Sequence, residues 1–181
     1  IKDAGVRRED LIIQSKCAIE PGKMYDFSKE HILSAVDGSL KRLGTDYLDV
    51  LLLHRPDALM EPEEVAEAFD ELEKSGKVRH FGVSNEDPYT MELLQSALHQ
   101  PICANQLQMS LTNATMIAQP MNTNICDGLN PVLDNGVLNY CRLHNITIQT
   151  WSSFQYGFFE GVFIGSEKYP KLNAKLDELA K

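Results

Sequence analysis

Apolar and polar positions follow a repeating order along the chain, in which a short apolar run precedes a stretch with helical spacing and another apolar run follows. Short runs of this kind are typical of buried strands, and apolar residues three or four apart are typical of helices. The order therefore predicts an alternation of strands and helices, as in α/β proteins. The predicted strands are Leu11–Cys17, Tyr47–His54, Val78–Asn85, Ile102–Gln108 and Ile146–Ser152.

The predicted helices have recognisable starts and stops. Ser28 is a suitable N-cap for the first helix, and Gly44 is a suitable stop. Pro62 suits the first turn of the second helix, which Gly76 ends. The other predicted helices are Pro88–His99, Leu133–His144 and Pro170–Lys181, the last with Leu172, Leu176 and Leu179 as its apolar residues.

The segment from Met109 to Asn130 has no hydrophobic period and is rich in Asn, Thr and Met. It predicts a long loop. Loops of this length inside compact domains are uncommon and often functional, but a surface insertion explains the pattern equally well.

Polar residues stand at the carboxyl ends of successive predicted strands. Strand interiors such as Val50–Leu53 are wholly apolar, which fits a parallel sheet covered on both faces or a barrel. A doubly wound sheet collects ligands only at its switch point, whereas a βα barrel brings all strand ends to one face. We therefore expect a partial TIM (β/α)8 barrel of about five consecutive βα units, a single domain over residues 1–181. The strand-end residues are Lys16, His54, Ser84, Asn85, Asn105, Gln106 and Ser152.

Composition narrows the possible partners. The 181 residues are 43% hydrophobic, enough for a core, and carry a formal net charge of −9. Nucleic acid and anionic membranes both require clustered positive charge, so neither is an expected partner. Apolar runs fall far short of the roughly 20 residues of a membrane helix. Four cysteines without CxxC spacing suit reduced thiols and a cytoplasmic location.

Several well-known motifs are absent, including GxGxxG, GxxxxGK[ST], HExxH and GxSxG. The five histidines lack metal-ligand spacing to one another, so no metal is expected. Lys16 and His54 end neighbouring predicted strands, where partial burial lowers the pKa of a lysine. Alone, Lys16 is compatible with a Schiff-base aldolase, although that reaction leaves Ser84, Asn85 and Gln106 without a role.

Five segments, in order along the chain, resemble one known family. They are a lysine strand (Arg8–Lys16), a histidine strand (Leu43–His54), a Gly-Val-Ser-Asn motif (Gly76–Asn85), an Asn-Gln strand (Ala104–Gln106) and an aromatic residue followed by Ser (Thr150–Ser152). Together they resemble the aldo-keto reductase family, whose members reduce carbonyl compounds by hydride transfer.

The resemblance implies a TIM-type barrel that binds a nicotinamide dinucleotide, usually NADPH, without a Rossmann domain; NADH is not excluded. It assigns Ser84, Asn85 and Gln106 to the nicotinamide carboxamide. It assigns Trp151 to stacking on the nicotinamide ring and Ser152 to the pyrophosphate. The implied substrate is a small carbonyl compound of unassigned identity, and the Met109–Asn130 segment is expected to border its pocket.

The resemblance also assigns Lys16 and His54 to catalysis. Lys16, paired with an Asp, lowers the pKa of a proton-donating Tyr, and His54 orients the carbonyl. That Asp and that Tyr fall before Ile1 in the family pattern, and the last two strands and a phosphate-binding segment fall after Lys181. Glu86 stands where an aromatic residue is usual.

We therefore expect an incomplete chain with little turnover of its own, whose missing strands come from other segments of the same protein. The alternatives are a cofactor-binding or regulatory relative without catalysis, or an inactive fragment. The sequence upstream of Ile1 distinguishes the reductase from these alternatives.

Overall fold

The computed structural model describes residues 5–118 and 136–181. Its centre is a parallel sheet of five strands, in which each strand pairs with the next one along the chain. The predicted α/β fold is confirmed, and the order of the strands is that of a partial barrel. The strands are β1 (Gln14–Cys17), β4 (Leu48–Leu53), β5 (Val78–Ser84), β6 (Ile102–Gln108) and β7 (Thr147–Trp151).

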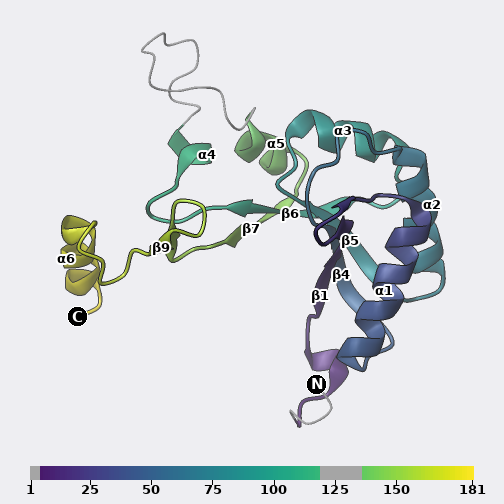
Figure 1. Cartoon of the computed structure of the whole chain (residues 1–181), viewed down its shortest axis with the longest axis horizontal. Coiled ribbons are helices and arrows are strands. Elements are labelled where there is room, and N and C mark those ends of the chain that lie inside the picture. Colours follow the sequence, from purple (N-terminus) through teal and green to yellow (C-terminus); the bar gives the residue numbers. More distant parts are fainter. Residues whose placement is uncertain (1–4, 119–135) are drawn as a thin grey trace.

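Helices cover the outer face of this sheet, with α1, α2 and α3 following one another around it (Figure 1). Their bounds are α1 Lys29–Leu43, α2 Pro62–Lys74, α3 Pro88–Ala97 and α5 Val137–Leu143. Both predicted ends of the first helix are confirmed: Ser28 accepts a hydrogen bond from the backbone N–H of His31, and Gly44 adopts the left-handed conformation with φ 65°.

The main core lies between the helices and the outer side of the sheet. Leu51, Leu53 and Phe81 are buried there, and Phe81 stacks on Phe69 of α2 with ring centres 4.1 Å apart. Because strand side chains alternate, the residues between them face the other way, into the concave inner side of the sheet. Leu52 is fully buried and yet lies outside the main core.

The sheet is curved strongly enough for side chains of its two edge strands, β1 and β7, to contact each other. The amides of Gln14 in β1 and Gln149 in β7 exchange two hydrogen bonds, each 2.9 Å long. Five strands do not close a barrel. The inner face nevertheless has the curvature of one.

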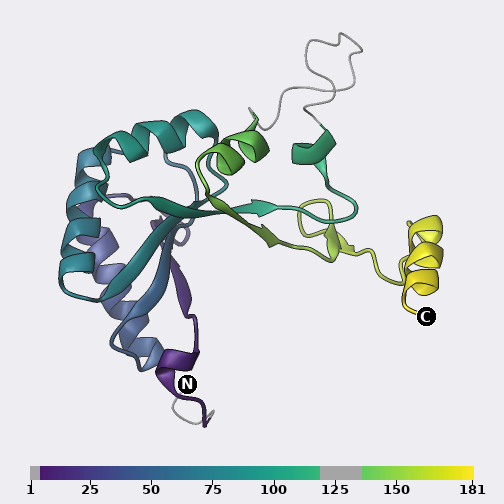
Figure 2. The ribbon, with the colours of Figure 1, turned by 180° about the vertical axis from the view of Figure 1, so that it is seen from behind.

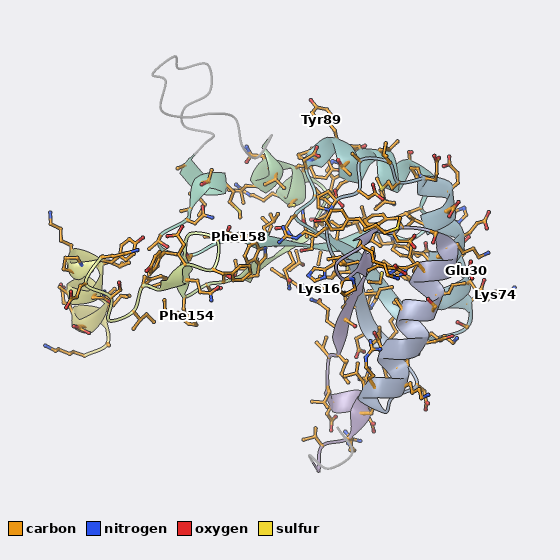
Figure 3. All side chains as sticks on the ribbon, in the orientation of Figure 1. Lys16, Glu30, Lys74, Tyr89, Phe154 and Phe158 are labelled. Atoms are coloured by element: carbon orange, nitrogen blue, oxygen red, sulfur yellow. The ribbon has the colours of Figure 1, made fainter. Side chains whose placement is uncertain are left out.

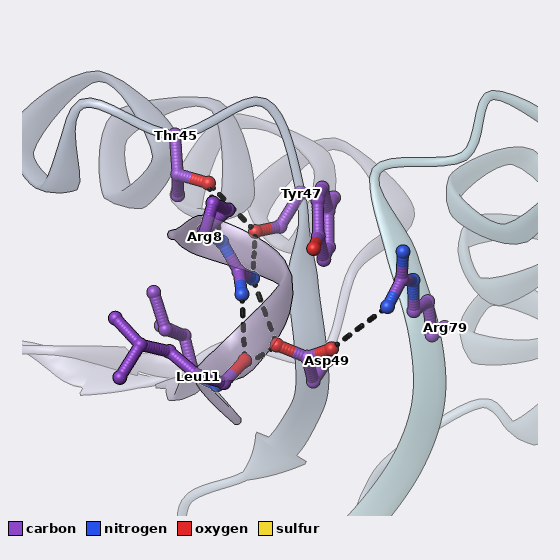
Figure 4. A network of polar contacts seen from close by, with 7 residues as sticks. Arg8, Leu11, Thr45, Tyr47, Asp49 and Arg79 are labelled. Atoms are coloured by element: carbon purple, nitrogen blue, oxygen red, sulfur yellow. Dashed lines mark hydrogen bonds and ion pairs between the residues drawn. The ribbon is translucent and has the colours of Figure 1, made fainter. Parts of the chain in front are cut away.

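A polar network fastens the amino end of the sheet (Figure 4). Asp49 of β4 accepts hydrogen bonds from the backbone N–H of Ile13, from Arg8 at 2.8 Å and from Arg79 at 3.1 Å. The two guanidinium groups lie 3.8 and 3.9 Å from the ring centre of Tyr47. Burial would raise the pKa of Asp49, but these hydrogen bonds and charges outweigh it and hold the pKa below its usual value.

Short elements add to the predicted pattern. A 3-10 turn covers Arg8–Asp10, and two small antiparallel hairpins follow β1 and β7. Strands of two residues are too short to show a hydrophobic period, so no pattern of residues predicts them. The hairpin strands are β2 (Ile19–Glu20), β3 (Met24–Tyr25), β8 (Gln155–Tyr156) and β9 (Gly161–Val162).

The long loop expected from Met109 to Asn130 contains two short elements where the structure describes it. Ser110 and Asn113 form an isolated bridge, and Thr115–Ala118 forms the short helix α4. The rest of the segment to Asn130, the first residues of the helix expected at Leu133–His144, and Cys126 lie outside the described residues. The described cysteines, Cys17, Cys103 and Cys141, are free thiols.

The last helix, α6 (Pro170–Leu179), contains no buried residue and stands apart from the sheet (Figures 1 and 2). Its leucines therefore do not join the core. Asn173 connects it to the preceding segment by donating to the backbone carbonyl of Phe163 at 2.9 Å. Among the helices of the described residues, none combines the length and apolar character needed to cross a membrane.

Candidate active site

The predicted site residues share the inner face of the sheet because of strand register. Lys16 lies opposite Leu52, and Ser84 lies opposite Gln106. His54 follows β4 two residues after Leu52, and Trp151 ends β7 two residues after Gln149, so both have the same parity as the inward residues. The polar side chains at four strand ends are thus directed to one opening at the carboxyl edge of the sheet, which we call the mouth.

A continuous series of hydrogen bonds joins these strand ends. Lys16 donates to the side-chain carbonyl of Gln106, and the Ser84 hydroxyl donates to the Gln106 backbone carbonyl at 3.0 Å. Asn85 donates to the Ser84 hydroxyl at 2.9 Å, and the Trp151 indole N–H donates to the Asn85 side-chain oxygen at 3.0 Å. The structure therefore brings Lys16, Ser84, Asn85, Gln106 and Trp151 together.

Asn85 occupies the pivot of this series, immediately after β5. Its φ is 62°, in the left-handed region, which asparagine tolerates better than most residues. Its backbone N–H donates to the carbonyl of Gln106 at 3.0 Å, which fixes the turn against β6. The side chain is thereby held between Ser84 and Trp151.

Two inward amides keep hydrogen-bonding capacity for a ligand. An amide side chain has two N–H donors, and Asn85 uses one of them on Ser84. Gln106 uses one on the side-chain oxygen of Gln149 at 3.1 Å. Within the part of the chain that the structure describes, each keeps a second N–H without a partner, which suits a carboxamide or carbonyl group. The sequence pattern does not mark Gln149 as a site residue, because Gln149 lies inside a strand rather than at its end.

Positive charge gathers at the mouth beside these amides. Burial and then the charge of Arg55 lower the pKa of Lys16. Burial, Lys16 and Arg55 lower the pKa of His54. His54 thus lies close enough to Lys16 to feel its charge, as expected for residues at neighbouring strand ends. Because its pKa is lowered from an ordinary value that is already below 7, the imidazole is neutral at pH 7. Arg55 had no role in the sequence analysis.

Trp151 and Ser152 lie where β7 leads into the β8–β9 hairpin. The ring of Phe159 stacks on Trp151 with centres 5.7 Å apart, and Phe158 approaches edge-on at 6.2 Å. Ser152 has a φ of 55°, and its hydroxyl donates to the side chain of Gln155 at 2.5 Å. Ser152 therefore lies next to the mouth but does not join the hydrogen-bond series of the other residues.

Asn105 and Glu86 face the helices instead of the mouth. Asn105 is fully buried and donates to the backbone carbonyl of Glu86 at 2.8 Å. Glu86 is only 2% exposed, and neither of its carboxylate oxygens has a hydrogen-bond partner among residues 5–118 and 136–181. Burial and then the charges of Asp87 and Asp57 raise the pKa of Glu86 to about 8. The carboxyl is therefore mostly protonated at neutral pH.

A cavity of about 300 Å³ opens next to Asn85. Glu86, Gln108, Met116 and Val137 contribute to its walls. Neither Lys16 nor His54 lines it. The candidate catalytic groups thus stand in the open mouth of the sheet and not in this cavity.

A second polar cluster surrounds the first turn of α1. The Nδ1 atom of His31 lies 3.8 Å from a carboxylate oxygen of Asp26 and 4.0 Å from one of Glu20. These three groups could hold a metal ion by their proximity, which a search for spacing between histidines did not reveal. Each carboxylate already has a partner, Ser28 N–H for Asp26 and Lys23 for Glu20. We interpret the cluster as an ion-pair network.

Comparison with known proteins places this site in context. The model of the aldo/keto reductase family matches residues 1–181. An uncharacterized oxidoreductase, YcsN, of Bacillus subtilis is 39% identical over 159 residues, which are 83% of this chain and 48% of that protein. A 6-dehydroglucose reductase of Agrobacterium fabrum is 35% identical over 176 residues, 92% of this chain and 54% of that protein.

Solved structures agree with the sequence relatives. A thermostable aldo-keto reductase in complex with the inhibitor epalrestat has a TM-score of 0.72 and 27% identity, and the match covers 99% of this chain and 55% of that one. The chain therefore spans about half the length of the relatives it matches.

Proposed function

The chain belongs to the aldo/keto reductase family, and from this premise we propose that it is part of an enzyme that reduces a small carbonyl compound to an alcohol with NADPH. Bound NADPH would supply the hydride, and NADH is the alternative donor. The proposal includes a cytoplasmic location and small-molecule partners rather than nucleic acid or membranes.

The single observation that carries the proposal is the hydrogen-bond series from Lys16 to Trp151. It holds Asn85 against the Trp151 indole and joins Gln106 to the same series through Ser84. A nicotinamide carboxamide needs both donors and acceptors close to an aromatic surface, so these residues fit it. We assign Ser84, Asn85 and Gln106 to the carboxamide and Trp151 to the ring. Ser152 is assigned to the pyrophosphate.

Lys16 and His54 are the proposed catalytic residues of this chain. A neutral His54 can donate one hydrogen bond to a substrate carbonyl oxygen and so fix its direction. The ammonium of Lys16 stabilises a phenolate and thus lowers the pKa of a nearby tyrosine. We propose that this tyrosine, its aspartate partner and the remaining strands of one barrel domain come from other segments of the same protein.

Cofactor binding tests the assignment through Trp151, the only tryptophan of the chain. NADPH is expected to quench its fluorescence. The variant Asn85→Asp keeps the size of the side chain and its tolerance of a positive φ but removes the N–H donors, so we expect NADPH to bind about 10-fold more weakly or worse. The exposed Asn139→Asp in α5 is the matched control. Unchanged affinity in Asn85→Asp would contradict the carboxamide assignment, and failure of NADPH and NADH to bind at all would contradict the proposed function.

A further inference from the structure

Arg55 is a half-buried cation at the mouth, and the proposed carbonyl chemistry gives it no task. It follows His54 directly, and its guanidinium carbon lies 5.8 Å from the ring centres of both Trp151 and Phe158. Figure 3 labels Lys16 near the middle of the molecule and Phe158 in the hairpin after β7. The charge of Arg55 contributes to the lowered pKa of Lys16 and of His54, so the three groups lie in one field.

No carboxylate balances this group of cations within residues 5–118 and 136–181. The ion pairs of that part of the chain involve other residues, although the whole chain carries 26 acidic residues. The family resemblance gives Lys16 an aspartate partner and gives Arg55 none. Like charges in a partly desolvated site raise the free energy of one another, and an anion relieves that cost.

We propose that Arg55 binds an oxyanion of the carbonyl substrate, which makes the substrate class an aldehyde or ketone that also carries a carboxylate or phosphate. This inference rests on the proposed reductase function. The planar guanidinium binds such groups through two parallel N–H donors. The charge of Arg55 reaches His54, and its guanidinium carbon lies 5.8 Å from the ring centre of Trp151, so an acidic group bound there would lie beside the carbonyl that His54 orients.

A cofactor phosphate offers the same oxyanion chemistry, so the test must separate the two sources. Succinic semialdehyde and butanal form a matched pair of aldehydes with and without a carboxylate, and both are assayed at saturating NADPH with the whole protein, including the segments that supply the tyrosine and the remaining strands. We expect Arg55→Gln to raise KM for succinic semialdehyde about 10- to 100-fold and to leave KM for butanal within about 2-fold. Arg55→Lys should fall between, because lysine keeps the charge but loses the paired donors.

Lys168→Gln is the matched control, because Lys168 is an exposed cation that also lies over an aromatic ring, 4.6 Å from the ring centre of Tyr156. It should change neither KM. If Arg55→Gln leaves both KM values unchanged, the inference is overturned. If it weakens binding of NADPH or inorganic pyrophosphate and leaves the KM of succinic semialdehyde unchanged, Arg55 serves the cofactor and the inference is likewise overturned.

A binding measurement distinguishes this inference from the proposed function. Acetate, but not the neutral isostere acetamide, should change the fluorescence of Trp151, and Arg55→Gln should abolish that response. A protein that binds neither nicotinamide cofactor and reduces neither aldehyde refutes the reductase function and the substrate assignment with it. An acetate response that depends on Arg55 would in that case still establish the oxyanion site, and its absence would refute the site.

Discussion

Replacing Glu86 by glutamine should make the protein more stable, by an amount that grows with pH. The carboxyl is 2% exposed, has no hydrogen-bond partner within the described part of the chain, and faces the charges of Asp87 and Asp57. Its pKa rises from 4.5 to about 8 on folding. The native state thus retains a proton that the unfolded chain has already lost, and raising the pH favours the unfolded chain.

The magnitude follows from the two pKa values of Glu86. Each pH unit between them corresponds to about 1.4 kcal/mol, so the cost to the native state is about 3 kcal/mol at pH 7, about 4 kcal/mol at pH 8, and approaches about 5 kcal/mol at higher pH. Below pH 4.5 both states are protonated and the cost disappears. These figures are upper limits, because water entry or a small shift of the turn after β5 relieves part of the cost.

Urea denaturation at several pH values, followed by the fluorescence of Trp151, measures this effect. The free energy of unfolding of Glu86→Gln should exceed that of the wild type by a margin that widens from pH 5 to pH 8. Glu167→Gln makes the same chemical change at an exposed position and should run parallel to the wild type. Parallel profiles for Glu86→Gln as well would show that Glu86 is ionised or solvated in the native state, contrary to our reasoning.

Three further substitutions probe the frame that holds the site, each through the urea midpoint followed by far-UV circular dichroism. Asp49→Asn should lower the free energy of unfolding by about 3 kcal/mol, because it leaves two arginines without their shared carboxylate. A decrease below about 1 kcal/mol would contradict this. Gly82→Ala should lower the free energy of unfolding by about 1–3 kcal/mol, since its Cβ would lie 2.6 Å from the backbone oxygen of Ala104. An unchanged free energy of unfolding would mean that β5 and β6 can separate freely. Ser28→Ala should cost about 1 kcal/mol by removing the cap on His31 N–H, whereas Ser28→Gly should cost less; equal losses would argue against capping.

Gly82 connects the stability of the sheet with the geometry of the mouth. It lies between Leu52 and Ala104 in the inner layer, two residues before Ser84, where the register of β5 and β6 shifts. A side chain here would push β6 away and move Gln106 relative to Ser84. Loss of stability and weaker NADPH binding are therefore expected together in Gly82→Ala.

The sequence by itself determined the five strands of the main sheet, both ends of the first helix and the identity of most residues at the mouth. Apolar runs mark buried strands because the helices bury the outer face of the sheet against the core. Ser28 and Gly44 mark a helix because capping depends on neighbours in the chain. The order of Lys16, His54, Ser84 and Gln106 at strand ends then followed from the parallel arrangement. These signals are local or periodic, so they can be read without coordinates.

Only the tertiary structure decided how these side chains meet. The bond between Asn85 and Trp151, the amide pair of Gln14 and Gln149, and the gathering of charge around Arg55 join positions far apart in the sequence. The burial of Glu86 without a partner is likewise invisible in its neighbours. Such contacts depend on strand register and on the curvature of the sheet, which arise from packing the whole chain rather than from any one segment.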